Sequence, residues 1–250
     1  MAVICYAVMC EVIHRGDVRY EIKPFTEWEN VAADFVISDP PFGIDFSGKE
    51  TNYNRDKSNV VDGYVEWEVS EYADRISNLL DTINESLVPD GTALVFSGMD
   101  NSHIIQQEII NSNLTFEGKL YWSYNFAPYC SRRPAHNVYE IFWVTNEERW
   151  YYDNECGYDH CTNGEANLSL IDVNREYHTD MPKYPTSTPS KLFRILYDHF
   201  TESGDTIFNP CAGSGMSGVV ADEMDRSAIL GDINAETLDI FEEIYDMYQQ

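Results

Sequence analysis

The chain has few basic residues for its length. Its 250 residues hold 16 lysines and arginines against 43 aspartates and glutamates, which gives a formal net charge of −27 at pH 7. Phosphate neutralisation by Lys and Arg supplies most non-specific affinity for nucleic acids, so this deficit argues against such a partner. A second explanation is the cytoplasm of a high-salt host, or a virus of such a host, where an acidic surface keeps the protein soluble and salt screens its self-repulsion. This explanation predicts unfolding on dialysis from molar salt into dilute buffer, and full stability in dilute buffer would contradict it.

Long apolar runs and a disulfide framework are also missing. No apolar stretch approaches the ~20 residues of a membrane span. The apolar residues 1–17 have no basic leader and no small-residue cleavage pattern, so we interpret them as a strand and not as a signal peptide. Six scattered cysteines favour a reducing cytoplasm. The stretch CGYDHC (156–161) has residue types that bind zinc, but without a second ligand pair at zinc-finger spacing we expect no metal.

The remaining composition, 43 % hydrophobic and 14 % aromatic, indicates a folded globule. Apolar spacing predicts a helix over 69–87, with Ser70 as its N-cap and the PDG at 89–91 as its end, and strands over 34–38 and 92–98 on either side of it. Further along, the patterns predict a helix over 102–112, strands over 119–126 and 138–145, a helix with Thr188 as N-cap and Pro189 as N1, a strand over 205–210, a glycine turn and helix over 212–224, a strand over 227–233 and a last helix from Asn234.

This alternation of strands and helices predicts a mostly parallel α/β sheet with right-handed crossovers. Residues 146–187 lack clear periodicity and are rich in Asn, Tyr and Asp. We interpret them as a small irregular insertion within a single domain that spans residues 1–250.

One strand ends in the sequence SDPPFG (38–43). Each proline ring fixes φ and pushes the preceding residue toward extended backbone, so residues 39–42 should form a stiff, extended segment. Its carbonyl groups have no helix or sheet partner, and a carboxylate and an aromatic ring lie beside them. Such a segment could hold a flat molecule with an NH2 group, although Asp-Pro is more often an ordinary turn.

A second motif, GSGMSG (213–218), follows a predicted strand and precedes a predicted helix, and Asp232 lies 19 residues after Gly213. In this context glycines allow close approach of a ligand, and the acid accepts hydrogen bonds from ribose hydroxyls. Alone, the motif favours a dinucleotide enzyme such as an NAD-dependent dehydrogenase, or a tight turn without a ligand. Only 18 residues follow Asp232, however, so the other strands must lie upstream. The part of the sheet that carries DPPF therefore comes first in the sequence, and the part that carries the glycine motif comes last.

Together the motifs resemble those of the S-adenosylmethionine-dependent amino-methyltransferases of nucleic-acid bases, in the permuted order that places DPPY/F before the glycine motif. The matching stretches are SDPPFG, LYWSYNF with RRPAHNVYEIFWVT, YPTSTPSKLFRIL, DTIFNPCAGSGMSG and AILGDI. The resemblance implies a Rossmann-like methyltransferase fold with a mostly parallel seven-stranded sheet and helices on both faces, S-adenosylmethionine as cofactor and DNA as partner. The chain departs from the usual pattern at four positions that bear on cofactor affinity: Thr188, Asn209, Cys211 and Met216.

The resemblance also assigns roles to residues. The Asp39 carboxylate and the Pro40 carbonyl would accept from the two N–H bonds of a base amine, Pro41 would keep the segment stiff, and Phe42 would stack on the base. An amine inside a duplex is out of reach, so the base must be flipped out. Asp at position 39 favours adenine N6 over cytosine N4. The residues expected at the cofactor are Asp17, Ser190, Lys191, Asn209, Pro210, Cys211, Gly213, Ser214, Gly215 and Asp232.

Residues 118–139 contain no Asp or Glu, although the chain is strongly acidic. Basic residues interleaved with aromatic residues suit contacts with phosphates and with an unstacked nucleobase. The alternative is that the stretch forms two buried strands, which would also lack acidic residues. The expected DNA contacts are Tyr129, Arg132 and Arg133, with a second patch of Lys49, Arg55 and Lys57. Other interpretations stay open: a cytosine-N4 or RNA methyltransferase, a catalytically silent homologue that binds nucleic acid, a homodimer or partner subunit, and a role in restriction-modification.

Overall fold

The computed structural model describes residues 11–44, 66–125, 134, 136–146, 150–153, 169–176 and 187–249. The strands in these ranges are β1 (Val12–Arg15), β2 (Val18–Ile22), β3 (Ala33–Ser38), β4 (Leu87–Ser97), β5 (Thr115–Ser123), β6 (Val138–Thr145), β7 (Leu170–Asp172), β8 (Thr206–Asn209) and β9 (Ser227–Asp232). The α-helices are α1 (Tyr72–Ser86), α2 (Ser102–Asn111), α3 (Ser190–Phe200), α4 (Met216–Glu223) and α5 (Glu236–Tyr248), and short 3-10 helices cover Phe25–Glu27 and Val69–Glu71.

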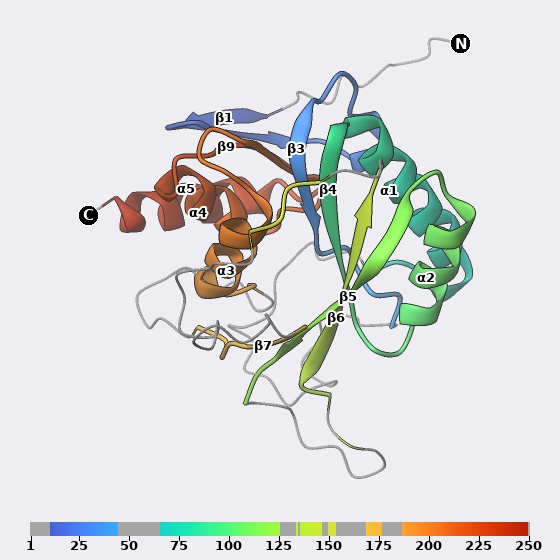
Figure 1. Cartoon of the computed structure of the whole chain (residues 1–250). Coiled ribbons are helices and arrows are strands. Elements are labelled where there is room, and N and C mark those ends of the chain that lie inside the picture. Colours follow the sequence, from blue (N-terminus) through green and yellow to red (C-terminus); the bar gives the residue numbers. More distant parts are fainter. Residues whose placement is uncertain are drawn as a thin grey trace, which may run out of the picture.

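The nine described strands form one sheet in the order β1-β2-β9-β8-β3-β4-β6-β5-β7 (Figure 1). Strands β2, β9, β8, β3 and β4 are parallel to one another, while β1 and β6 run antiparallel to their neighbours. The predicted mostly parallel α/β sheet is therefore confirmed. The two strands beyond the expected seven lie at its edges: β1 pairs with β2, and β7, which comes from within the segment expected to be irregular, pairs with β5.

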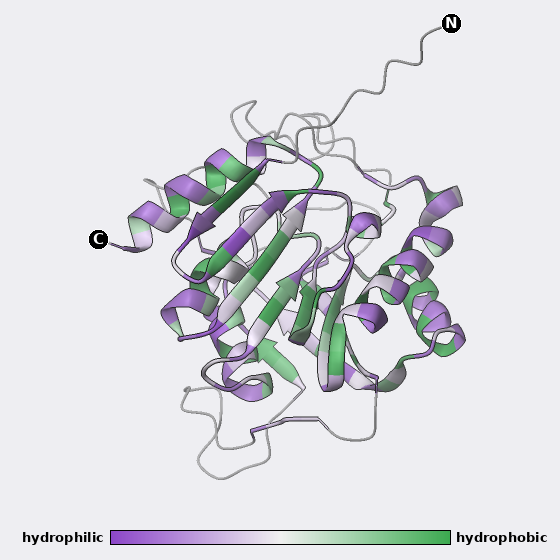
Figure 2. Ribbon diagram, turned by 90° about the horizontal axis from the view of Figure 1, so that it is seen from above, coloured by the Kyte–Doolittle hydropathy of each residue, from purple (hydrophilic) through white to green (hydrophobic). Residues whose placement is uncertain are grey.

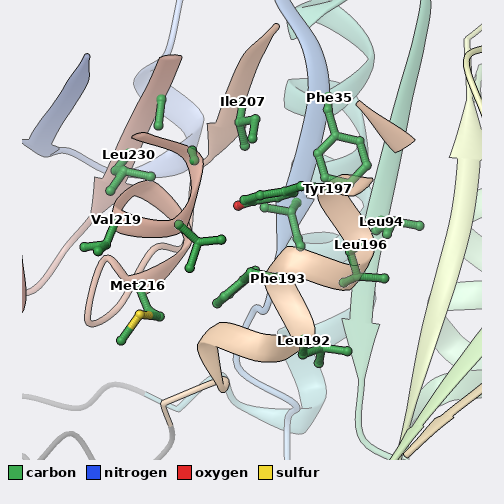
Figure 3. Close-up of a cluster of buried hydrophobic side chains, with 14 of the residues drawn as sticks. Phe35, Leu94, Leu192, Phe193, Leu196, Tyr197, Ile207, Met216, Val219 and Leu230 are labelled. Atoms are coloured by element: carbon green, nitrogen blue, oxygen red, sulfur yellow. The ribbon is translucent and has the colours of Figure 1, made fainter. Parts of the chain in front are cut away.

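Helices cover both faces of the sheet, with α3, α4 and α5 on one face and α1 and α2 on the other (Figure 1). Strand β3 is buried on both faces, since Phe35 and Ile37 belong to the core under α3 to α5 and Val36 to the core under α1 and α2. Such two-sided burial explains why central parallel strands are almost continuously apolar. Figure 2 shows this concentration of hydrophobic residues in the central strands, and Figure 3 shows side chains of α3 directed at Phe35 and Leu94.

Three predicted element ends differ in the structure. Helix α1 begins at Tyr72 after a 3-10 turn, with no side-chain cap, so Ser70 is not its N-cap. The PDG at 89–91 lies inside β4, where Asp90 has a φ of 66° and the register with β3 shifts. The segment therefore forms an irregularity within a strand and does not stop the helix. Helix α3 begins at Ser190 with Pro189 at the N-cap position, so the Thr188 hydroxyl is free for another partner.

The parallel strands bring the two predicted motifs to one edge of the sheet. Because β3, β4, β8 and β9 run in the same direction, their carboxyl ends meet at one edge, where Asp39, the glycine loop and Asp232 follow or end a strand. Ligands of open α/β sheets bind outside these carboxyl ends. No helix in the described ranges is long and apolar enough to span a membrane.

Candidate active site

The DPPF segment leaves β3 with its first carbonyl groups unengaged. Within the described part of the chain, no hydrogen bond reaches the carbonyl oxygens of Pro40 or Pro41. The loop is fixed one residue further on, where Asn101 Nδ2 donates to the carbonyls of Phe42 at 2.9 Å and Gly43 at 2.8 Å. The segment is thus held at its far end while the acceptors beside Asp39 stay available.

The Phe42 ring has a defined place at this edge. Its centroid lies 5.3 Å from that of Tyr139 on β6, at an interplanar angle of 59°. A Cβ atom at Gly98, which directly follows β4, would stand 3.0 Å from Phe42 Cδ2, so this glycine leaves room for the ring. Phe42 is only partly buried at this place.

Protein atoms surround the Asp39 carboxyl, although the residue as a whole keeps a small exposed fraction. Burial raises the pKa of Asp39 to about 6, because desolvation disfavours the charged form. The charge of Arg175 and a hydrogen bond from Thr188 Oγ1 to Asp39 Oδ2, at 3.2 Å, act in the opposite direction. The carboxyl is ionised above its pKa, so at neutral pH Asp39 is a hydrogen-bond acceptor.

On the other side of the site, the glycine loop joins β8 to α4. Gly213 and Gly215 have φ angles of 54° and 74°, in the left-handed region that favours glycine. Asp232 holds the loop: its Oδ2 accepts from Gly213 N and its Oδ1 from Asn234 N, both at 2.9 Å. The Tyr20 hydroxyl donates to the Gly213 carbonyl at 2.6 Å. The left-handed glycines and these hydrogen bonds together fix the conformation of the loop.

Gly215 also has a packing reason to be glycine. A Cβ atom there would stand 2.4 Å from Phe241 Cδ2 of α5, a separation that real Cβ atoms essentially never show. The prediction assigned this glycine to close ligand approach. The structure shows that its missing side chain makes room for α5 inside the core.

Asn209 and Cys211, the two residues of NPCAGSG that depart from the usual family pattern, interact with neighbouring groups of the protein. Buried Asn209 donates from Nδ2 to Ser217 Oγ at 3.0 Å and accepts at Oδ1 from Cys211 N at 3.1 Å, so its amide serves as donor and acceptor at once. Burial raises the pKa of the Cys211 thiol to about 12, and the charges of Asp232 and Asp39 act in the same direction. The Cys211 thiol is therefore neutral, and the acids of both halves act on it.

The segment before α3 touches both halves. Thr188 donates to Asp39, and Ser187 Oγ lies 3.2 Å from Ser214 Oγ in the glycine loop. Ser190 and Lys191, expected at the cofactor, donate from their backbone N–H groups to the Glu176 carboxylate at 3.0 and 3.2 Å. The contribution of Thr188 to Asp39 was missed because a threonine before proline was interpreted as a helix cap.

The structure corrects the placement of Asp17. This exposed residue precedes β2, where its carbonyl accepts from Ala228 N near the start of β9. Asp232 pairs with Ile22 at the other end of these two parallel strands. The full length of the strands therefore separates Asp17 from the site, although the resemblance placed this residue at the cofactor. The expected DNA contacts lie outside the described residues: Lys49, Arg55, Lys57, Tyr129, Arg132 and Arg133. The stretch 156–161, for which we expected no metal, also lies outside them.

The strand order and the two adjoining motifs define a methyltransferase of the S-adenosylmethionine-dependent class, and solved structures share this fold. The PvuII DNA methyltransferase, which is cytosine-N4-specific, superposes with a TM-score of 0.69 at 17 % identity over 93 % of this chain and 91 % of its own. The complex of M1.HpyAVI with S-adenosylmethionine gives a TM-score of 0.62 at 17 % identity over 85 % of this chain and 88 % of its own.

A family described as DNA methylase, with N6 and N4 methyltransferases as its members, matches residues 33–243, and the chain belongs to this family. The predicted resemblance is thereby confirmed, and with it S-adenosylmethionine as the family's cofactor. Related proteins include the type II methyltransferase M2.DpnII of Streptococcus pneumoniae, 25 % identical over 83 % of this chain and 80 % of its own length. The DNA adenine methyltransferase YhdJ of Escherichia coli is 22 % identical over 90 % of this chain and 79 % of its own length.

Proposed function

We propose that the protein transfers a methyl group from S-adenosylmethionine to N6 of adenine in DNA, with the target base flipped out of the helix. One observation carries this proposal: Asp39, with the unengaged Pro40 carbonyl after it, and Asp232 with its glycine loop follow or end parallel strands at one sheet edge, and both charges act on Cys211. A base acceptor and a cofactor acid are thus held at the same sheet edge.

The two acceptors address the central difficulty of the reaction. The lone pair of an exocyclic amine is delocalised into the ring, so the amine is a poor nucleophile. Hydrogen bonds from its two N–H groups to Asp39 and the Pro40 carbonyl localise that pair and stabilise the positive charge that develops on nitrogen. S-adenosylmethionine supplies an electrophilic methyl group on a sulfonium. The flipped base stacks on the ring of Phe42, and Pro41 restricts the backbone so that the two acceptors keep their positions.

The residues around Asp232 fit the cofactor. The Asp232 carboxylate accepts from the backbone N–H groups of Gly213, Asn234 and Ile233 and retains capacity for a further donor such as a ribose hydroxyl. Ile233, which follows it, is 52 % exposed and offers an apolar surface suited to an adenine ring. The sequence prediction missed Ile233, although its position directly after the acid was a usable signal. Asn209, Pro210, Cys211 and Ser214 line the same loop, and Ser190 and Lys191 follow the segment that touches it.

DNA binding is proposed through the acid-free stretch and the loop after DPPF, with Arg132, Arg133, Lys49, Arg55, Lys57 and Tyr129 as the expected contacts. Residues 146–187 are proposed as a short target-recognition region within a single catalytic domain. The region is too short to imply a long recognition sequence, so a second copy or a partner subunit is the natural source of further specificity. A role in restriction-modification is consistent with type II relatives such as M2.DpnII.

The choice of adenine rests on Asp39, because the cytosine-N4 branch usually carries Ser at this position. The deciding experiment incubates the protein with labelled S-adenosylmethionine and mixed-sequence DNA in molar salt, and then digests the DNA to nucleosides. Label in N6-methyldeoxyadenosine, absent with Asp39→Ala, is the expected result. Label in N4-methyldeoxycytidine would contradict the base assignment, label only in a parallel incubation with RNA would contradict the substrate, and no transfer at any salt concentration would support a silent homologue.

A further inference from the structure

Arg175 lies in an aromatic cage that no sequence motif marks. Its guanidinium carbon is 5.0 Å from the ring centroid of Trp122, 4.7 Å from that of Tyr124 and 5.5 Å from that of Tyr139. It also donates a hydrogen bond from an Nη atom to the Tyr139 hydroxyl at 2.9 Å. An arginine on the protein surface does not ordinarily contact three aromatic rings. The three cation–π contacts therefore hold this charge at a defined position.

The cage adjoins the proposed catalytic segment. Tyr139 contacts the Phe42 ring, and the charge of Arg175 acts on Asp39 and lowers its pKa. The two side chains form no ion pair within 4 Å in the described part of the chain, so the guanidinium does not occupy the carboxylate oxygens. Arg175 therefore influences Asp39 through its field and leaves the carboxylate available to an amine.

Among the described residues near Asp39, the side chains of Tyr72, Tyr139 and Cys211 keep their protons at neutral pH, while the carboxyl groups of Glu66 and Asp232 act on the same Tyr72 and Cys211 side chains. Burial raises the pKa of Tyr72 on α1 and of Tyr139 on β6 above the ordinary tyrosine value, and it raises that of the Cys211 thiol to about 12. Thr188, before α3, contributes a neutral hydroxyl. Arg175 is thus the cation, among the groups that act on Asp39 in the described residues, that opposes the desolvation of its carboxylate.

The backbone on both sides of Arg175 is fixed. The Asn174 side chain accepts from Asn125 N at 3.0 Å, and the Val173 carbonyl accepts from Trp122 Nε1 at 2.7 Å. On the other side, Glu176 accepts three hydrogen bonds from Ser190 and Lys191 at the start of α3. These anchors tie the segment around Arg175 to the strand pair and to the helix, so they fix the backbone position from which the guanidinium reaches its cage.

We propose that Arg175 is a positioning residue that holds Asp39 as a carboxylate ready to accept the base amine, while its aromatic cage keeps the guanidinium off the carboxylate oxygens. The proposal rests on the proposed methyl transfer. It gives the segment 173–176 a part in the chemistry, although this segment lies within residues 146–187, whose proposed role is target recognition.

The test compares Arg175→Met, which removes the charge, with Arg175→Lys, which keeps a charge without the planar stacking. Arg75→Met on the exposed face of α1 is the matched control. Turnover at saturating DNA and S-adenosylmethionine is followed from pH 5 to pH 9. We expect the acid limb of the Arg175→Met profile to move up by about one pH unit, since loss of a neighbouring opposite charge raises a carboxyl pKa by this order. Activity should recover at high pH, and Arg175→Lys should shift the limb less.

A second measurement needs no activity. Unfolding free energies of wild type, Arg175→Met, Asp39→Asn and the double variant, measured at pH 5 and pH 8, form a cycle in which the coupling between positions 39 and 175 should be larger at pH 8. An unshifted acid limb with a raised KM for DNA would overturn the proposal and make Arg175 a DNA contact, and a coupling that does not change with pH would overturn it as well. If wild type transfers no methyl group, the proposed function fails, and the cycle still decides the interaction between Arg175 and Asp39.

Discussion

The two halves of the site are built by different means. The glycine half, from β8 to β9, is set mainly by its own segment, with two glycines in left-handed conformations and Asp232 accepting from Gly213 and Asn234, and the Tyr20 hydroxyl adds one bond from β2. The DPPF half depends on side chains that arrive from distant segments, since Asn101, Tyr139 and Thr188 each hold or touch part of it. A backbone-defined half should fail when its geometry is changed, whereas a side-chain-defined half should respond to charge and to single hydrogen bonds.

The largest effect is expected in the backbone-defined half. Gly215→Ala combines an unfavourable positive φ with a Cβ atom 2.4 Å from the Phe241 ring, so we expect a loss of about 3–5 kcal/mol in the free energy of unfolding. Gly204→Ala is the matched control, because Gly204 also has a positive φ, of 95°, but no atom within 4 Å of the added Cβ. Chemical denaturation measures both, and equal losses would show that the contact with α5 does not matter.

The second largest effect is expected for Asp232→Asn, which should weaken the binding of S-adenosylmethionine. Replacing one carboxylate oxygen by an NH2 group sets a donor against the N–H of Gly213 or Asn234 and removes an acceptor from the ribose. We expect S-adenosylmethionine to bind roughly 30- to 100-fold more weakly, since charge-assisted hydrogen bonds contribute about 1.5–3 kcal/mol. Calorimetric titration measures this, with Asp205→Asn at the opposite end of β8 as control. An unchanged affinity would remove Asp232 from the cofactor site.

Asp39→Asn should abolish transfer yet stabilise the fold. The folded-state pKa of about 6 exceeds the ordinary value of 3.8 for an aspartate, so the folded protein holds the proton more tightly than the unfolded chain does. Stability from this group is complete below about pH 4 and is lost as the pH rises to about 6. We therefore expect the variant to exceed wild type by about 1–2 kcal/mol at pH 7.5 and to match it near pH 4. Thermal melts at both pH values test this, and a variant less stable at pH 7.5 would contradict the burial of this charge.

Thr188→Val should have the smallest effect. It removes the hydrogen bond to Asp39 Oδ2 while keeping the side-chain shape, so the pKa of Asp39 should rise and turnover near pH 6.5 should fall several-fold, in line with about 1 kcal/mol for one hydrogen bond. Thr188→Ser should retain activity, and Thr82→Val on α1 provides the control. Equal turnover of the Thr188 and Thr82 variants across the pH range would exclude a role for this hydroxyl.

The same contrast explains what could be predicted from the sequence. Strands such as β6 and β9, helix α2 and the glycine loop follow from local patterns, since short-range spacing and φ preferences determine them. The predicted helix end at 89–91 was wrong because tertiary pairing with β3 overrode the turn signal of PDG, and Ser70 was wrong because a 3-10 turn precedes α1. Arg175 and Thr188 could not be assigned, because their importance arises from contacts with residues more than a hundred positions away or on other strands.

The adjacent side chains of Arg175 and Glu176 have a consequence for exchanges of the proposed recognition segment in this protein. One residue serves the pocket around Asp39 and the next secures the start of α3, so two neighbouring positions of the proposed recognition segment are committed to other parts of the protein. A transplant of residues 146–187 from a relative should therefore fail unless it carries a matching pair. New target preferences in such a protein would have to evolve around this fixed dipeptide.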